Sequence, residues 1–66
     1  MNTSTTQYAR VLAGDITPGD EVARTRTATF NTVAEVQHNA STVWLIYTTG
    51  GRDRPGKTAK WWRKVA

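Results

Sequence analysis

The chain has 66 residues and no cysteine, so it offers room for one small domain and excludes disulfides and thiolate metal sites. Nine Lys and Arg residues against five Asp and Glu residues give a net charge of +4, which points to an acidic or polyanionic partner. The sequence shows no signal peptide and no apolar run near the roughly 20 residues that cross a bilayer. We therefore expect a cytoplasmic protein without a membrane partner.

The first strand is expected after a polar opening. Residues 1–7 are Asn, Thr, Ser and Gln after the first Met, and they predict a disordered N-terminus. This leaves residues 8–66 as the single domain. Apolar positions within residues 8–12 predict a short edge strand. Pro18 and Gly19 then predict a type II turn, because Pro fixes φ at its second position and Gly accepts a positive φ at its third.

Two further stretches before the middle of the chain have strand character. Residues 21–27 are too polar for a central strand and predict an edge strand or an extended arm. Residues 28–38 alternate between apolar and polar and predict a half-exposed strand, with Ala34 and Val36 on one face and Val33 on the other. A helix is the alternative there, but Thr and Val disfavour it.

The longest apolar run, residues 43–47, predicts the central strand. Its side chains are β-branched, aromatic or Leu, a short hairpin connection at residues 38–41 leads into it, and Gly50 and Gly51 end it. We place Val36, Val43 and Leu45 in the core. The two faces of this strand hold Val43, Leu45 and Tyr47 on one side and Trp44 and Ile46 on the other.

The end of the chain predicts a loop and a last strand. Residues 50–57 contain three Gly and one Pro and indicate a mobile loop. Residues 58–65 favour a strand over a helix, and as a strand they place Trp61 and Trp62 on opposite faces. Four to five short antiparallel strands without a convincing helix predict an all-β fold. Such a short chain is expected to close into a small β-barrel or a sandwich, since closure removes exposed edges.

The order of these elements resembles small SH3-like barrels. Pro18-Gly19-Asp20 resembles the lead-in to the first strand of KOW-type barrels, and strands at 33–36 and 43–47 and a last strand with Trp61 follow it. In style the chain is similar to short open reading frames of actinobacterial phages. The resemblance implies a binding module in nucleic-acid complexes or protein assemblies and no catalysis, in the host cytoplasm if a phage encodes it.

One motif suggests nucleotide chemistry. Residues 51–58 match the P-loop pattern G-x-x-x-x-G-K-[ST], but a P-loop also needs a following helix and a parallel sheet, for which this length leaves no room. We interpret the match as a cationic turn. The alternative is a loop that binds a phosphate through its amides and Lys57 without hydrolysing it.

Catalytic residues are otherwise lacking. The only histidine, His38, lies in an expected turn, and Ser4 and Ser41 have no recognisable catalytic context. The scattered carboxylates make a poor ligand set for a metal. We therefore expect no enzyme activity, no cofactor and no metal site.

The aromatic and basic residues carry the functional expectation. Residues 51–66 hold six of the nine basic residues, and at least one of the three Trp is expected in an exposed patch. We slightly favour docking on a host or partner protein through an aromatic and basic surface. The alternatives are nucleic-acid binding by the basic C-terminal loop and strand, and homodimerisation. The expected binding residues are Trp44, Arg52, Arg54, Lys57, Lys60, Trp61, Trp62 and Arg63.

Overall fold

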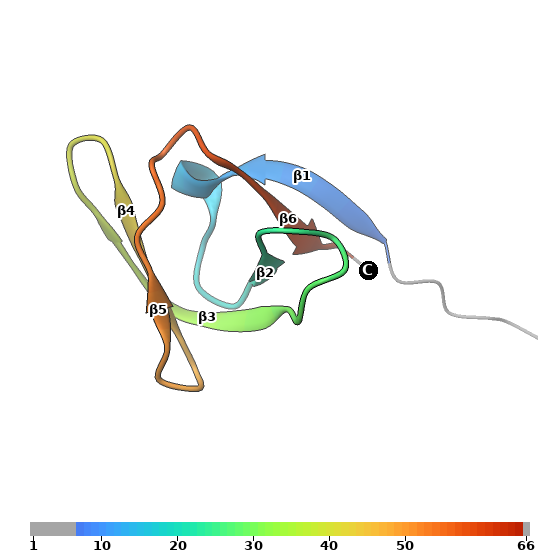
Figure 1. Cartoon of the computed structure of the whole chain (residues 1–66). Coiled ribbons are helices and arrows are strands. Elements are labelled where there is room, and N and C mark those ends of the chain that lie inside the picture. Colours follow the sequence, from blue (N-terminus) through green and yellow to red (C-terminus); the bar gives the residue numbers. More distant parts are fainter. Residues whose placement is uncertain (1–6, 66) are drawn as a thin grey trace, which may run out of the picture.

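The computed structural model describes residues 7–65 and confirms the all-β class. The predicted disorder of residues 1–7 falls outside the described residues except at Gln7, whose C=O accepts a hydrogen bond from the Val65 N–H at 2.9 Å. The elements are β1 (Tyr8–Leu12), the 3-10 turn η1 (Ala13–Asp15), β2 (Glu21–Ala23), β3 (Asn31–His38), β4 (Val43–Tyr47), β5 (Arg52–Asp53) and β6 (Lys60–Lys64), as Figure 1 shows.

The strands form one open antiparallel sheet in the order β1-β6-β2-β3-β4-β5. This sheet has six strands where four to five were expected. The additional strand, β5, lies inside the segment predicted as a mobile loop and pairs Arg52 with Ile46 and Asp53 with Leu45. No pairing joins β1 to β5 within the described part of the chain, so the sheet is not closed into a barrel.

Strand β2 differs from the prediction in length and position. It covers three residues and lies between β6 and β3, whereas an edge strand or arm over residues 21–27 was expected. Its apolar pair explains the interior position, because Val22 is fully buried and Ala23 nearly so. The polar residues after Ala23 form bends and a turn.

A bulge in β3 changes the predicted alternation. Val33 pairs with Tyr47 and Glu35 with Ile46, so Ala34 is the extra residue of a β-bulge. The inserted residue brings Val33 and Val36 to the same face although their positions differ in parity. Val33 is buried, and Val36 is partly buried and packs against the core.

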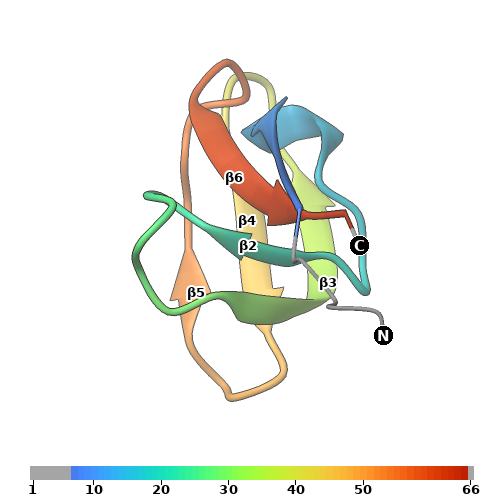
Figure 2. The same cartoon turned by 90° about the vertical axis from the view of Figure 1, so that its right-hand side faces the viewer.

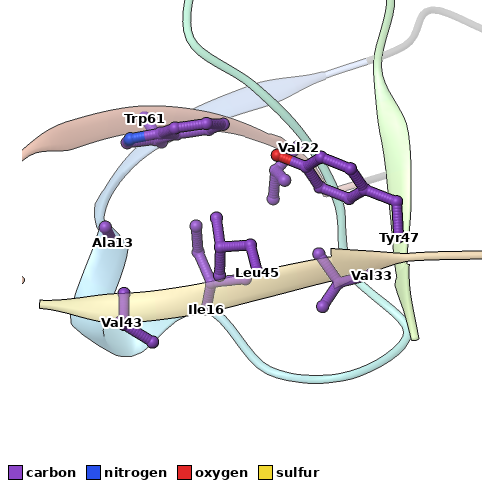
Figure 3. Close-up of a cluster of buried hydrophobic side chains, with 8 residues drawn as sticks. All are labelled: Ala13, Ile16, Val22, Val33, Val43, Leu45, Tyr47 and Trp61. Carbon is purple, nitrogen blue, oxygen red and sulfur yellow. The ribbon is translucent and has the colours of Figure 1, made fainter. Parts of the chain in front are cut away.

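The core lies on the side of β4 that was predicted to be buried. Val43, Leu45 and Tyr47 are buried, and Trp44 and Ile46 are half-buried on the opposite face. Figure 3 shows Trp61 across the cluster from Val43 and Leu45, and Figure 2 shows β6 in front of β4. The cluster consists of Ala13, Ile16, Val22, Val33, Val43, Leu45, Tyr47 and Trp61.

The Pro-Gly turn is confirmed and fixes the position of Asp20. Gly19 has φ of 95°, which the third position of a type II turn requires, and the Asp20 N–H donates to the Thr17 C=O at 3.1 Å. The Asp20 carboxylate accepts a hydrogen bond from the Thr17 N–H at 2.9 Å. The Val33 N–H donates to the Asp20 C=O at 2.8 Å, so the turn is held against β3.

Candidate binding surfaces

The eight predicted binding residues do not form one surface. Trp61 is 3% exposed and belongs to the core, because it lies on the inward face of β6, so it is not available as a contact residue. Arg63 pairs with Asp20 and Lys57 lies in a turn. Two outward groups remain. Trp44, Arg52 and Arg54 lie at the β5 end of the sheet, and Lys60 and Trp62 lie at the β1 end.

The first group, together with Ile46, is called the Trp44 surface. The alternation of β4 turns Trp44 and Ile46 away from the core, and β5 places Arg52 opposite Ile46. The guanidinium carbons of Arg52 and Arg54 lie 5.3 and 5.2 Å from the centre of the Trp44 ring. At this distance both arginines stack on the ring by cation–π attraction.

Stacking leaves the hydrogen-bonding capacity of the arginines unused. Neither Arg52 nor Arg54 forms an ion pair with another described residue. A guanidinium that lies on a ring keeps its N–H donors at its edge, where a carboxylate or phosphate can accept two of them. The Trp44 surface therefore presents ordered donors beside a half-buried ring.

The second group consists of Arg10, Leu12, Lys60 and Trp62 and is called the Trp62 surface. Trp62 pairs with Arg10 on β1 and with Ala23 on β2, and Ala23 is 4% exposed. The Arg10 guanidinium lies 5.0 Å from the centre of the Trp62 ring. Leu12 pairs with Lys60 and is 39% exposed. Arg10 and Leu12 were not among the predicted binding residues, because only the strand register places them beside Trp62.

Ion pairs neutralise part of the basic C-terminal segment. An Arg63 nitrogen lies 3.7 Å from an Asp20 carboxylate oxygen, and the Lys64 Nζ lies 3.5 Å from a Glu21 oxygen. The antiparallel pairing of β2 with β6 brings these acidic residues to the end of β6. Within residues 7–65, the basic residues without an ion pair are Arg10, Arg26, Arg52, Arg54, Lys57 and Lys60.

A cation covers each remaining aromatic ring near the surface. Tyr8 lies 5.2 Å from Phe30 between ring centres, and Arg26 lies 5.4 Å from the Tyr8 centre. The Lys64 Nζ lies 5.4 Å from the Phe30 centre. Such coverage reduces the ring area to which a nucleic-acid base can stack.

A hydrogen-bonded chain fixes β5 to the rest of the sheet. The Tyr47 hydroxyl donates to the Asp53 carboxylate at 2.7 Å, and an Arg24 nitrogen lies 3.3 Å from the other Asp53 oxygen. Burial, and then the hydrogen bond to Asp53, raise the pKa of Tyr47 far above its ordinary value, so this hydroxyl remains a donor. Asp53 thereby positions the short strand that carries Arg52 and leads into Arg54.

The P-loop-like segment does not have the geometry of a phosphate-binding loop. It runs through β5, a bridge between Gly56 and Thr42, and a turn, and then enters β6 rather than a helix. The Lys57 N–H donates to the Ser41 C=O, and the Lys57 C=O accepts from the Gly14 N–H, both at 3.0 Å. A Cβ on Gly14 would lie 3.2 Å from the Lys57 Cβ, so the two segments pack closely. The segment connects two parts of the sheet.

Metal-binding and membrane-spanning features are not found in the described residues. No group of three or more His, Cys, Asp and Glu residues there is placed to hold a metal ion. His38 is exposed at the end of β3. None of the helices formed by residues 7–65 is long and apolar enough to cross a membrane.

No model of a known family matches the chain, and neither curated proteins nor solved structures gave a match.

Proposed function

We propose that the chain is a small non-catalytic binding module that docks on an acidic region of a partner protein through the Trp44 surface. The observation that carries the proposal is the stacking of Arg52 and Arg54 on Trp44 without an acidic partner in the described residues. Tryptophan and arginine are the residues most often found at the energetic centre of protein interfaces.

The arrangement suits carboxylates because the donors are held before binding. The Trp44 ring restricts Arg52 and Arg54, and the Tyr47–Asp53 hydrogen bond restricts the strand that carries Arg52 and is followed directly by Arg54. Pre-ordered side chains lose less conformational freedom on association, so more of the interaction free energy contributes to affinity. Ile46 and the half-buried ring supply the apolar contact that a protein partner can cover.

The proposal extends to the type of fold and to the biological setting. The packing of Trp61 across the core from Leu45 and the Arg24–Asp53 ion pair between the end of β2 and the edge strand β5 support an SH3-like arrangement of the strands, in which β1 and β5 are not paired. With the resemblance to short phage reading frames, this favours a phage-type accessory protein. Its partner in this proposal is a host protein in the cytoplasm.

Nucleic-acid binding is the second candidate. Its support is the set of basic residues without ion pairs, which a phosphate backbone can neutralise. Two features weigh against it. Four of the six basic residues without an ion pair in residues 7–65 are divided between surfaces at the two ends of the strand order, and the surface rings already have cations over them.

The experiment is a pull-down from actinobacterial lysate, with and without nuclease. The bait proteins are the wild-type chain, a double variant with Arg52→Ala and Arg54→Ala, and Lys57→Ala as the matched control. Lys57 is also a basic residue without an ion pair among the described residues, but it lies outside the Trp44 surface.

The proposal predicts protein capture that survives nuclease, is lost in the double variant and is retained in Lys57→Ala. Capture that disappears with nuclease would show that the chain binds nucleic acid rather than a protein. Equal capture by all three baits would show that the Trp44 surface does not bind the partner.

A further inference from the structure

The outer edge of β1 has unpaired backbone groups. The Gln7 C=O accepts a hydrogen bond from the Val65 N–H at 2.9 Å, and the Ala13 N–H donates to the Ala59 C=O at 2.8 Å. The backbone N–H and C=O groups of the odd-numbered residues of β1 therefore point toward β6. In an antiparallel pair the residues between them point their N–H and C=O groups the other way. Those that have no backbone partner among the described residues are the N–H and C=O groups of Tyr8 and Arg10 and the N–H of Leu12. The Leu12 C=O is at the N-cap of η1 and belongs to that turn.

A hollow with mixed apolar and basic character lies at this edge. Its lining residues are Arg10, Val11 and Leu12 from β1 and Lys60 from β6. Leu12 exposes more than a third of its surface, and neither Arg10 nor Lys60 forms an ion pair within residues 7–65. The edge therefore offers backbone groups, apolar area and two cations together.

We propose that β1 accepts an extended acidic segment of a partner protein as an additional antiparallel strand. Strand addition satisfies the free backbone groups of β1, and alternate side chains of the added strand reach opposite faces of the sheet. Acidic residues on one face meet Arg10 and Lys60 beside Leu12, and apolar residues on the opposite face contact Val11, which also lines the hollow. The inference rests on the proposed function only for the acidic character of the partner, since it uses a different surface.

A second copy of the chain is a poor occupant of the same edge. Two β1 strands paired antiparallel about their middle residue would place Arg10 opposite Arg10. Like charges directly opposite each other destabilise a strand pair. Charged residues at an edge are a usual means by which proteins prevent such self-pairing. Charge complementarity therefore selects an acidic strand over a copy of β1.

The backbone at Leu12 allows a specific test. Leu12 has φ of −75° and ψ of 143°, which the ring of proline can adopt. The Leu12 N–H points away from β6, so Leu12→Pro removes one outward donor without removing a hydrogen bond of the sheet. Leu12→Ala is the matched control, because it removes the same side chain and keeps the donor.

The probe is a capped peptide that alternates glutamate and valine, titrated by NMR chemical shifts against the full chain. Two control peptides replace glutamate with lysine or carry N-methyl groups on alternate residues. We expect shifts along β1, binding about fivefold to tenfold weaker for Leu12→Pro than for Leu12→Ala, and further loss for Arg10→Glu. The N-methylated and lysine peptides should bind far more weakly.

Several outcomes would overturn the inference. Equal binding of the peptide to Leu12→Pro and Leu12→Ala excludes strand addition. Equal binding of the N-methylated and unmodified peptides to the wild-type chain also excludes it, and this comparison does not depend on the folding of a variant. A wild-type dimer in sedimentation that Arg10→Glu alters assigns the edge to a second copy. Chemical shift changes that are confined to β4 and β5 and are lost with Arg52→Ala and Arg54→Ala would agree with the proposed function and would contradict strand addition at β1.

Discussion

The hydroxyl of Tyr47, at the end of the central strand, donates a 2.7 Å hydrogen bond to the carboxylate of Asp53 on the edge strand β5. Tyr47 is 6% exposed, and Asp53 also pairs with Arg24 at 3.3 Å. This bond connects the core to the strand that carries Arg52. A two-residue strand has few hydrogen bonds of its own, so its position depends on such side-chain contacts.

Tyr47→Phe is predicted to lower stability and to change its dependence on alkaline pH. Loss of the hydrogen bond should cost about 1 kcal/mol of unfolding free energy at neutral pH. The folded-state pKa of Tyr47 is raised above its ordinary value near 10, so the wild-type unfolded state loses the tyrosine proton first. The contribution of Tyr47 is therefore present below pH 10 and is lost as pH rises above it.

The measurement is urea unfolding of wild type and Tyr47→Phe at neutral pH and at several values above pH 10. The other titrating groups are common to both proteins, so the difference isolates Tyr47. The stability gap should narrow and then reverse as pH rises. A gap that stays constant across the series contradicts the buried hydrogen bond.

Leu45→Ala tests the position of the core. Leu45 is fully buried in the cluster, so its truncation should cost about 2–5 kcal/mol and can unfold so small a domain. Leu12→Ala removes the same atoms from a side chain that is 39% exposed and should cost far less. Thermal unfolding of both variants provides the comparison, and similar losses would show that β4 is wrongly oriented.

Gly19→Ala tests the turn before β2. Gly19 has φ of 95°, which an L side chain rarely adopts, so the substitution should cost upwards of about 1 kcal/mol although no atom crowds a new Cβ. Gly51→Ala is the control, because Gly51 has no positive φ and its nearest contact is an ordinary 3.6 Å to the Tyr47 ring. Equal melting temperatures for both variants would argue against the type II turn.

Lys57→Ala tests the P-loop-like motif. The backbone of Lys57 makes the hydrogen bonds that hold this turn, so loss of the side chain should leave the fold nearly unchanged. We also expect no ATP hydrolysis by the wild-type chain, because β6 follows the turn where a P-loop has a helix. Hydrolysis that Lys57→Ala abolishes would contradict the non-catalytic reading.

The sequence predicted those elements whose pattern is local. The run at residues 43–47 predicted a central strand with the correct buried face, and Pro18 and Gly19 predicted their turn. The short strand β5 was missed because two polar residues in a Gly-rich segment have no periodicity, and they pair only because β4 lies beside them. The bulge at Ala34 was missed for a similar reason, since register is a property of the strand pair.

The candidate surfaces were predicted only in part. Trp44, Arg52 and Arg54 were recognised by residue type, but their stacking depends on the pairing of β4 with β5. Arg10 was missed because its contact with Trp62 joins opposite ends of the chain. The basic C-terminal segment suggested more free charge than the fold leaves, since Asp20 and Glu21 form ion pairs with Arg63 and Lys64 that sequence spacing does not show.

The central claim is that the arginines on Trp44 serve a protein partner rather than a nucleic acid. Its most direct test is a titration of tryptophan fluorescence with generic single- and double-stranded nucleic acid over a salt series. We expect no saturable change even at a low salt concentration of about 50 mM, because each surface offers too few free cations for tight phosphate binding. Saturable binding with a log–log salt slope of roughly −4 to −5, flattened by about one unit for each of Arg52→Ala and Arg54→Ala, would contradict the claim.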